Sequence, residues 1–315
     1  MPEIDAEKAH LPVLLRETME LLEPQNGGLF VDATLGLGGH SEAMLDTSPK
    51  TRVIGFDQDA EALKLATERL TRFGERFRGI HSNFSAVKTA ADDDSVDGIL
   101  ADLGVSSMQL DSETRGFSFR FDAPLDMRMD PDSEDMTAAE LLATESRDEI
   151  ANIIYRYGEE RHSRKIARWI VEKREAGTPI TTTFELADLV RRAVPHSKKD
   201  RIHPATRTFQ ALRIAVNNEL EIIERFIDDA VEILKTNGIL AIITFHSLED
   251  RIVKQAFQRL SGKCSCPPKI PQCVCGAVKK VDLLTRKPII ASETEQIENP
   301  RSRSAKLRAV QKLGL

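Results

Sequence analysis

The sequence of 315 residues predicts a doubly wound α/β domain that is interrupted by an all-helical insertion. Short apolar runs alternate with helical patterns over the first hundred residues, which is typical of βαβ units around a parallel sheet. Only helical spacing follows, and strand patterning returns near residue 239. We therefore expect a discontinuous α/β domain over residues 1–110 and 216–315, with a helical domain over residues 111–215 between its parts.

Each element of the α/β domain has a local signal. Apolar runs bounded by turn residues predict strands at residues 29–32, 51–57, 77–83, 96–102, 239–245 and 307–310. Helical spacing predicts helices at residues 41–45 and 60–73. Because right-handed crossovers bring the carboxyl ends of parallel strands to one edge of the sheet, residues at these ends should lie close together.

The helices of the insertion begin at capping signals, in which Ser or Thr is followed three residues later by Glu. This pattern occurs at Thr137, Ser146 and Thr182. Pro204 is expected to begin another helix that runs to Asn217. A further helix is expected over residues 218–235, with Asn237–Gly238 as its stop signal.

Composition argues against several classes of protein. Lys and Arg total 44 while Asp and Glu total 50, and the net charge of −6 disfavours a protein that simply coats a polyanion. Aromatic residues make up 5%, which is too few for a base-stacking platform. Apolar stretches fall far short of the ~20 residues that span a bilayer, and the acidic N-terminus is unlike a secretory signal. We expect a soluble cytoplasmic protein with no membrane partner.

A glycine-rich loop follows the first strand, which ends at Asp32. The stretch Gly36-Leu-Gly-Gly-His40 leads into a helix, so its backbone can approach a ligand and present free N–H groups. Asp57 ends the second strand 21 residues after Gly36, where a carboxylate can accept both hydroxyls of a ribose. The alternative is a tight turn with a solvated Asp57. The pattern is more similar to the S-adenosylmethionine loop of class I methyltransferases than to a dinucleotide fingerprint.

Two further strand ends point to the same edge of the sheet. Asn83 and Phe84 follow the third strand, where an apolar ring can lie against adenine. Asp102 ends the fourth strand. Taken singly, Phe84 could be a core residue and Asp102 a helix cap. Four strand ends that converge on one edge favour a ligand site.

Long and unusual strings, spread over nearly the whole chain, identify a family. They are His10 to Leu15, Gly38 to His40, Ala101 to Ser107 with Gln109 to Asp111, Arg115 to Phe119, Pro124 to Asp130, His203 to Arg213, Asn217 to Leu220, Phe245 to Arg251 and Asn299 to Arg308. On these strings the sequence resembles the bacterial 16S ribosomal RNA (cytosine-N4)-methyltransferase family RsmH, also called MraW.

The resemblance implies a fold, a cofactor and a substrate. It implies a class I (Rossmann-like) S-adenosylmethionine-dependent methyltransferase domain with an inserted helical domain. The methyl acceptor would be N4 of a cytidine in the decoding region of 16S rRNA, at position 1402 in the usual rRNA numbering. Carried over residue by residue, the cofactor contacts would be Gly38, Gly39, His40, Asp57, Phe84, Asp102 and Gln109. The sequence leaves open whether the substrate is free rRNA or the small ribosomal subunit, and whether the chain forms a homodimer.

The chemistry of the acceptor suggests catalytic residues. The N4 lone pair is delocalised into the ring, so transfer needs in-line placement and a group that accepts a hydrogen bond from the amine. The target base must also be unpaired or flipped. We expect Asp102 to orient the amine as well as the cofactor. His246 is a second candidate for the target pocket, with a structural hydrogen bond as the alternative. Attack through C5 is disfavoured because no Cys lies at a predicted sheet edge.

Asp126 and Arg128 lie in the string Pro124 to Asp130 and leave two interpretations open. The segment could be a loop over the active site, or the two side chains could form an internal ion pair that fixes the insertion to the main domain.

Basic residues gather in the insertion and the tail despite the acidic total. Candidates for phosphate binding are Arg191, Arg192, Lys198, Lys199, Arg207, Arg301 and Arg303. The alternative is a solvated charged face. Basic runs in an acidic chain favour binding of RNA phosphates.

The four cysteines form one cluster, Cys264, Cys266, Cys273 and Cys275. Four thiolates can hold a tetrahedral structural zinc, but these C-x-C pairs are tighter than the usual C-x2-C knuckle. Zinc and free or redox-active thiols therefore remain equal alternatives.

Two other functions compete with methyl transfer. A nicotinamide-dependent oxidoreductase lacks support because the sequence has no full G-x-G-x-x-G pattern. An RNA-binding module without catalysis would not need Gly38, Asp57 and Asp102 at successive strand ends.

Overall fold

The computed structural model describes residues 12–195, 203–264, 266 and 277–314. The chain divides into two compact units, which are Met1–Gly104 with Leu220–Leu315, and Val105–Glu219. The two units therefore meet in the sequence after residue 104 and after residue 219. The sequence predicts these two boundaries after residues 110 and 215. Below, each unit is described by itself.

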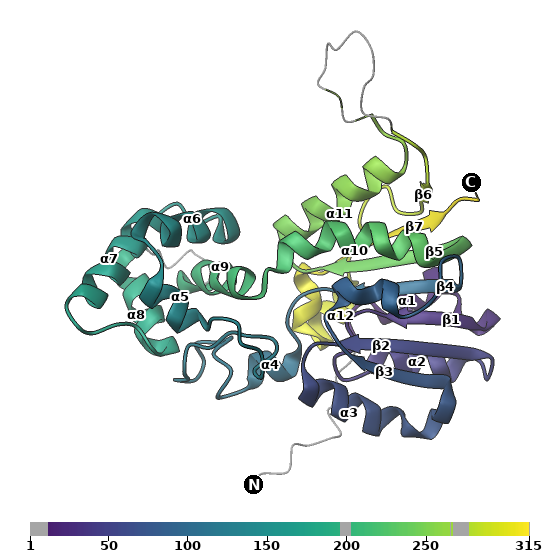
Figure 1. The fold of residues 1–315 in the computed structure, drawn as a ribbon, viewed down its shortest axis with the longest axis horizontal. Helices are drawn as coiled ribbons and strands as arrows, with labels where there is room; N and C mark the ends of the chain where they lie inside the picture. The colour runs from purple at the N-terminus through teal and green to yellow at the C-terminus, as the bar shows by residue number, and fades with distance from the viewer. Residues whose placement is uncertain (1–11, 196–202, 265, 267–276, 315) are drawn as a thin grey trace. The chain divides into compact units, whose positions relative to one another are not determined.

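The first unit holds one sheet of seven strands in the order β3-β2-β1-β4-β5-β7-β6 (Figure 1). The strands are β1 (Gly28–Asp32), β2 (Thr51–Asp57), β3 (Phe77–His81), β4 (Val96–Asp102), β5 (Leu234–Thr244), β6 (Val281–Leu283) and β7 (Lys306–Lys312). The pairs among β1 to β5 are parallel, and β7 pairs antiparallel with both β5 and β6. The predicted α/β fold is confirmed. The chain runs outward from β1 to β2 and β3 on one side, then returns to the other side of β1 with β4, so the strand order reverses between β1 and β4.

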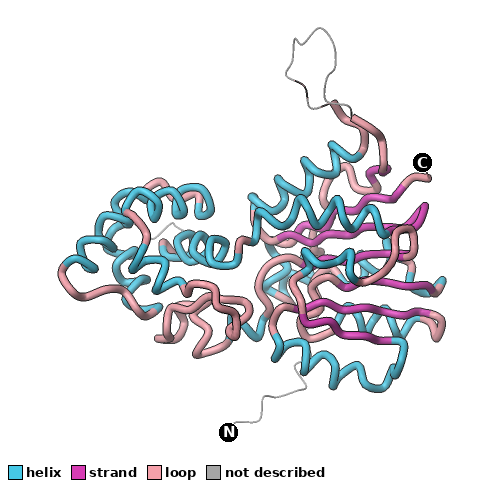
Figure 2. The backbone as a smooth tube through the Cα atoms, viewed as in Figure 1, coloured by secondary structure: helices cyan, strands magenta, loops and turns pink. Residues whose placement is uncertain are grey.

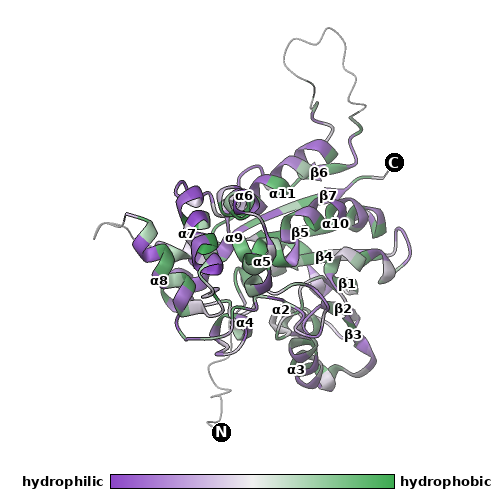
Figure 3. Cartoon of the chain, turned by 60° about the vertical axis from the view of Figure 1, so that its left-hand side comes forward, coloured by the Kyte–Doolittle hydropathy of each residue, from purple (hydrophilic) through white to green (hydrophobic). Residues whose placement is uncertain are grey.

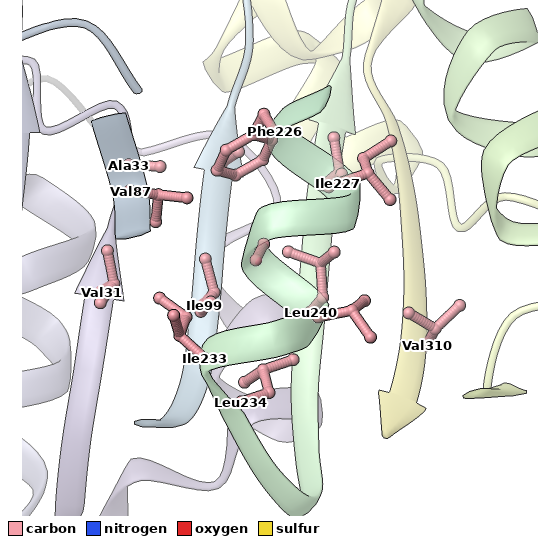
Figure 4. Close-up of a cluster of buried hydrophobic side chains, with 14 of the residues drawn as sticks. Val31, Ala33, Val87, Ile99, Phe226, Ile227, Ile233, Leu234, Leu240 and Val310 are labelled. Carbon is pink, nitrogen blue, oxygen red and sulfur yellow. The ribbon is translucent and has the colours of Figure 1, made fainter. Parts of the chain in front are cut away.

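Helices cover both faces of this sheet, as the alternating side chains of the strands require (Figure 2). They are α1 (Leu15–Leu22), α2 (Gly39–Thr47), α3 (Ala60–Leu70), α10 (Glu219–Ile233), α11 (Ser247–Leu260) and α12 (Glu293–Glu298). Val31 packs with Phe226 and Ile227 of α10 in one buried cluster (Figure 4). Its neighbour Phe30 faces the other way and packs in a second cluster with residues of α1, α2 and α3.

The predicted helix stop at Asn237–Gly238 is wrong. The helix ends at Ile233, and β5 begins at once with Leu234. Leu234 pairs with Val96, but the next pair is Ile239 with Gly98, so β5 carries extra residues at this point. Asn237 has a φ of 69°, the left-handed conformation in which Asn and Gly are enriched. The Asn–Gly signal therefore marks an irregularity inside a strand.

The second unit is helical, as predicted. Its helices are α4 (Ser107–Asp111), α5 (Ala138–Thr144), α6 (Arg147–Gly158), α7 (Ser163–Glu175), α8 (Thr183–Ala193) and α9 (Ala205–Asn217). The capping boxes at Thr137 and Thr182 are present, and Ser146 caps α6 by accepting from the backbone of Glu149. Its core is a separate buried cluster of apolar residues from these helices. Among the residues with assigned structure in either unit, no helix has both the length and the apolar character to cross a bilayer.

Candidate active site

Three aspartates end neighbouring parallel strands of the first unit. Asp32 ends β1, Asp57 ends β2 and Asp102 ends β4, so all three lie at the carboxyl edge of the sheet. Ligands of open α/β sheets bind at this edge, next to the point where the strand order reverses. The predicted convergence of these strand ends is therefore present, and the surroundings of each carboxylate show what it can do.

Asp32 is buried and accepts hydrogen bonds from the loop and the helix that follow β1. Its side chain is 1% exposed, and it accepts hydrogen bonds from the Ser41 hydroxyl at 2.7 Å and from the Thr34 backbone N–H at 3.3 Å. Burial raises the pKa of Asp32 to about 6, while these hydrogen bonds act in the opposite direction. Both bonds fix the path between β1 and α2.

Asp57 holds the glycine loop in place. Its carboxylate accepts hydrogen bonds from the backbone N–H groups of Gly36 at 2.7 Å and Asp59 at 2.8 Å. Gly36 has a φ of 53°, and no atom lies within 4 Å of the point where a Cβ would stand. Burial raises the pKa of Asp57 to about 6. The carboxylate therefore fixes the turn after β1 and is not merely solvated, and its contact with a ribose stays a prediction.

Asp102 has the most unusual surroundings of the three. Its Oδ1 is buried and has no hydrogen-bond partner within the part of the chain that the structure describes. Burial, and then the nearby charges of Asp32 and Glu249, raise the pKa of Asp102 well above its ordinary value. Native proteins rarely leave a buried polar oxygen without a partner, so this atom fits a ligand that donates a hydrogen bond.

Thr34 connects Asp102 to the glycine loop, a contact that sequence reasoning missed. The backbone N–H of Asp102 donates to the Thr34 hydroxyl at 2.5 Å. The sequence shows Thr34 only as a residue where S-adenosylmethionine loops often have glycine. The hydroxyl gives a physical reason for this departure, since it fixes the end of β4 against the loop after β1.

The stretch Gly38 to His40 begins α2 and also anchors the segment before α1. Gly38 is the N-cap with a φ of 78°, and no side chain caps the first turn, so its backbone N–H groups can bind an anion. A Cβ on Gly39 would stand 2.6 Å from Cγ of Pro12. The buried His40 ring places Nε2 3.1 Å from the Val13 carbonyl oxygen, and burial lowers its pKa to about 4. The His40 side chain therefore has a structural partner, and its backbone is the part that can face a ligand.

The end of β3 places Phe84 beside α10. Asn83 caps the following turn by accepting from the Ser85 N–H, and its side-chain amide donates to Gln58 at 2.7 Å. The half-buried Phe84 ring lies edge-on to Phe226, with centroids 5.1 Å apart. This contact fits the core interpretation of Phe84. Its proposed contact with adenine stays a prediction.

His246 caps α11 together with Glu249. Glu249 is 1% exposed and accepts from the Phe245 N–H at 2.8 Å, while its own N–H donates to Nδ1 of His246 at 3.4 Å. Nε2 of His246 lies 3.1 Å from Oε1 of Glu249. Nδ1 of His246 thus has a structural hydrogen bond, whereas its buried Nε2 has no partner of hydrogen-bonding geometry among the described residues. The place of His246 in the target pocket stays a prediction. Sequence reasoning missed Glu249, although its spacing of three residues after the cap is a capping signal.

Two predicted features belong to the second unit. Gln109 is buried in a capping box, where its side chain accepts from the Ser106 N–H at 3.0 Å. Arg128 and Asp126 form a two-pronged ion pair at 2.8 and 2.9 Å, and Arg128 also donates to the Ser133 carbonyl at 2.6 Å. The ion pair is therefore internal to one loop.

The candidate RNA-binding residues differ in their surroundings. Arg191 and Arg192 are exposed at the end of α8, and both pair with Asp188, at 2.6 and 2.9 Å. Arg207 is exposed at the start of α9. Lys198 and Lys199 lie outside the described residues. In the tail, Arg303 is exposed and Arg301 is half-buried.

The cysteine cluster is described only in part. Cys264 is exposed, and its sulfur accepts from the Cys266 N–H at 3.4 Å. Cys273 and Cys275 lie outside the described residues. A structural zinc at the four cysteines therefore stays a prediction, which metal analysis of the purified protein tests.

Comparisons with known proteins assign the chain to a family. The sequence profile of the MraW methylase family matches residues 7–313. A relative from Trichlorobacter lovleyi, named ribosomal RNA small subunit methyltransferase H, is 52% identical over 97% of this chain and 98% of its own length. A relative of the same name from Geobacter sulfurreducens is 51% identical over 97% of this chain and 99% of its own length. One from Geotalea daltonii is 50% identical over 98% of this chain and its entire length.

Proposed function

We propose, from the premise that this chain belongs to the MraW methylase family, that it methylates 16S rRNA with S-adenosylmethionine as donor. The acceptor is the exocyclic N4 of cytidine 1402, in the decoding region. The observation that carries this proposal is the buried, unpartnered Oδ1 of Asp102 at the end of β4. It supplies a hydrogen-bond acceptor at the place where the sheet offers a ligand site.

The residues of the first unit fit the donor molecule part by part. The uncapped first turn of α2, at Gly38 to His40, suits the carboxylate of the methionine moiety. Asp57 suits the ribose hydroxyls, because a carboxylate retains lone pairs beyond its two backbone bonds. Phe84 offers a ring to adenine. Gln109 is proposed as a contact on the family resemblance alone. When bound, S-adenosylmethionine supplies an activated methyl group on a sulfonium centre.

Asp102 has the properties needed to assist a weak nucleophile. Accepting a hydrogen bond from the N4 amine localises its lone pair and orients it toward the methyl group. The raised pKa makes the Asp102 carboxylate a stronger acceptor than an ordinary aspartate. Thr34 fixes the backbone of Asp102, so the carboxylate is held in place before the substrate arrives. His246 is the second proposed group in the target pocket.

The RNA is held through its phosphates. Arginines on α8 and α9 and in the tail provide positive charge, at Arg191, Arg192, Arg207, Arg301 and Arg303, and all of them except the half-buried Arg301 are exposed. Lys198 and Lys199 complete the proposed set. Few aromatic residues are available for stacking, so shape and phosphate contacts carry recognition. We propose the assembled small subunit as the substrate, and the cytoplasm as the place of reaction.

A methyl-transfer assay with radiolabelled S-adenosylmethionine tests this function. Free 16S rRNA and purified small subunits are offered separately, and the labelled base is mapped. We expect label on N4 of cytidine 1402 in small subunits and a large loss of label with Asp102→Asn. Absence of label from both substrates, or label at another base, would contradict the proposal. Label on free rRNA alone would contradict the choice of substrate.

A further inference from the structure

A basic groove lies between α6 and α7 of the helical unit, and its lining includes none of the arginines already proposed to hold RNA. Its volume is about 800 Å³. It is lined by the first two turns of both helices, at Arg147, Asp148, Ala151, Asn152, Arg164, Lys165 and Arg168. Four of these side chains carry positive charge and one carries negative charge. In Figure 3 much of the ribbon of α7 is purple, the colour of hydrophilic residues.

The positive charges of this groove lie at positions where they destabilise the helices that carry them. Arg147 is the first residue of α6, where the helix dipole favours acidic side chains. Arg164 and Arg168 are four residues apart on α7, and like charges at this spacing repel each other. Helix stability therefore does not explain why these cations face one groove.

Nearby acids neutralise these charges only weakly. Arg147 pairs with Asp148 at 3.5 Å and Arg168 with Glu172 at 3.4 Å, and all four side chains are more than half exposed. Exposed pairs of this kind contribute little and exchange readily for another anion. Among the residues that the structure describes, Arg164 and Lys165 have no acidic partner within ion-pair distance. The groove thus presents positive charge that an external anion can use.

We propose that this groove is a second RNA-binding site, which holds backbone phosphates of the rRNA substrate. The inference rests on the proposed function, since it assumes that the partner is RNA. Arginine guanidinium groups match phosphate oxygens with two parallel N–H bonds, and the Asn152 amide adds a neutral donor in the same groove. An acidic protein surface on the ribosome is the competing partner, and the test separates the two.

Trp169 provides a spectroscopic probe of the groove. It is the only tryptophan of the sequence and is half-buried on α7. The ammonium group of Lys165 lies 4.9 Å from the centre of its ring. A phosphate that binds Lys165 perturbs this cation–π contact, and we expect the emission of Trp169 to change with it.

The test uses the full-length protein and a 16S rRNA fragment of the decoding region. Arg164→Gln with Arg168→Gln removes two phosphate contacts, so the slope of log Kd against log salt should fall by about 1.5, and affinity at 0.15 M salt by roughly 10- to 30-fold. The matched control, Lys64→Gln with Arg225→Gln, removes the same charge from exposed positions on α3 and α10. Melting temperature and S-adenosylmethionine affinity check that both variants fold.

Three results would overturn the inference. Equal losses in the two double variants would show an effect of net charge alone. An unchanged salt slope for the fragment, together with weaker binding to small subunits, would assign the groove to a protein. If the groove variant does not fold, titration of the unaltered protein with the fragment decides, and constant Trp169 emission on binding rules the groove out. Failure of the proposed function differs from all three, because the unaltered enzyme would then transfer no methyl group to 16S rRNA.

Discussion

Asp102 joins two properties that a buried carboxylate seldom combines, an oxygen without a described partner and a pKa raised by burial and by neighbouring acids. The raised pKa has a direct consequence for pH dependence. Only the deprotonated form accepts a hydrogen bond from the amine at both oxygens, so the rate should rise with pH through the pKa of Asp102. An ordinary aspartate would have the midpoint of this rise near pH 4.

Asp102→Asn should lower kcat by about 10²- to 10⁴-fold, the usual contribution of a positioned proton acceptor. The acidic limb of the pH–rate profile should disappear with it. Single-turnover methyl transfer at saturating S-adenosylmethionine, measured between pH 5 and 9, checks both effects. A variant that kept the acidic limb would place the titrating group elsewhere.

His40 predicts a second pH effect, this time on stability. Its folded pKa of about 4 lies below the ordinary 6.5 because the ring is buried, and the bond to the Val13 carbonyl offsets this lowering only in part. Between pH 6.5 and pH 4, His40 is protonated in the unfolded chain but neutral in the folded chain. The free energy of unfolding therefore falls as the pH drops through this range. The size of this loss is about 3 kcal/mol, at about 1.4 kcal/mol per unit of pKa shift.

His40→Gln removes this titration and keeps a hydrogen-bonding side chain. The stability of the variant relative to the unaltered protein should therefore rise by about 3 kcal/mol between pH 7 and pH 4. Chemical denaturation at several pH values measures it. Asp32 and Asp57 also titrate in this range, but they are common to both proteins and cancel in the difference. His81→Gln, at an exposed ring, is the control. If the stability difference between His40→Gln and the unaltered protein did not change with pH, the folded chain would protonate His40 at the same pH as the unfolded chain.

At the scale of elements, the loop from Arg115 to Asp130 shows how the helical unit orders an irregular segment. Met127 is fully buried with a φ of 65°, a strained conformation for a long side chain. Asn217 at the end of α9 compensates for this strain. Its amide accepts from the Met129 N–H at 2.7 Å and donates to the Met127 carbonyl at 2.8 Å.

Asn217→Ala should destabilise the helical unit by about 2 kcal/mol, because two backbone groups of the loop lose their partner. Urea denaturation followed by circular dichroism measures the loss. Asn26→Ala is the comparison, since the Asn26 side chain is exposed and bonds the exposed side chain of Glu23, and we expect a change within about 0.5 kcal/mol. Equal effects of the two substitutions would show that the loop does not depend on Asn217.

Elements with a local cause were predictable from the sequence, and those with a tertiary cause were not. The strands at residues 51–57 and 96–102 have the predicted bounds, because apolar runs between turn residues determine them. The Asn237–Gly238 irregularity depends on pairing with β4, which no local pattern reveals. The residues of the candidate site also divide into those with a local cause and those with a tertiary cause. Asp57 could be placed at a strand end, but the bond from Asp102 to Thr34 and the contact of Gly39 with Pro12 join distant segments.

At the scale of the whole molecule, a net charge of −6 misrepresents a chain whose charges are segregated. Acidic residues gather at residues 92–94 and 122–149, while basic residues gather on α7, at the end of α8 and in the tail. Because screening limits electrostatic attraction to about 10 Å at moderate salt, a polyanion responds to the local charge of the surface it touches. The opposing charges within each basic surface therefore decide how strongly that surface binds RNA.

Asp188 makes this testable on α8, since it pairs with both Arg191 and Arg192. An RNA phosphate must compete with this carboxylate for the two guanidinium groups. Asp188→Asn should therefore tighten binding of the 16S rRNA fragment and steepen its salt dependence. Arg191→Gln with Arg192→Gln should do the reverse, by about 0.7 to 0.9 units of slope per lost phosphate contact. Fluorescence anisotropy between 50 and 300 mM salt measures both. If Asp188→Asn left the slope unchanged while the arginine variant lowered it, the arginines would bind RNA without competition from the acid. If neither variant moved the slope, α8 would be a solvated face, and recognition of the rRNA would rest on the remaining basic surfaces.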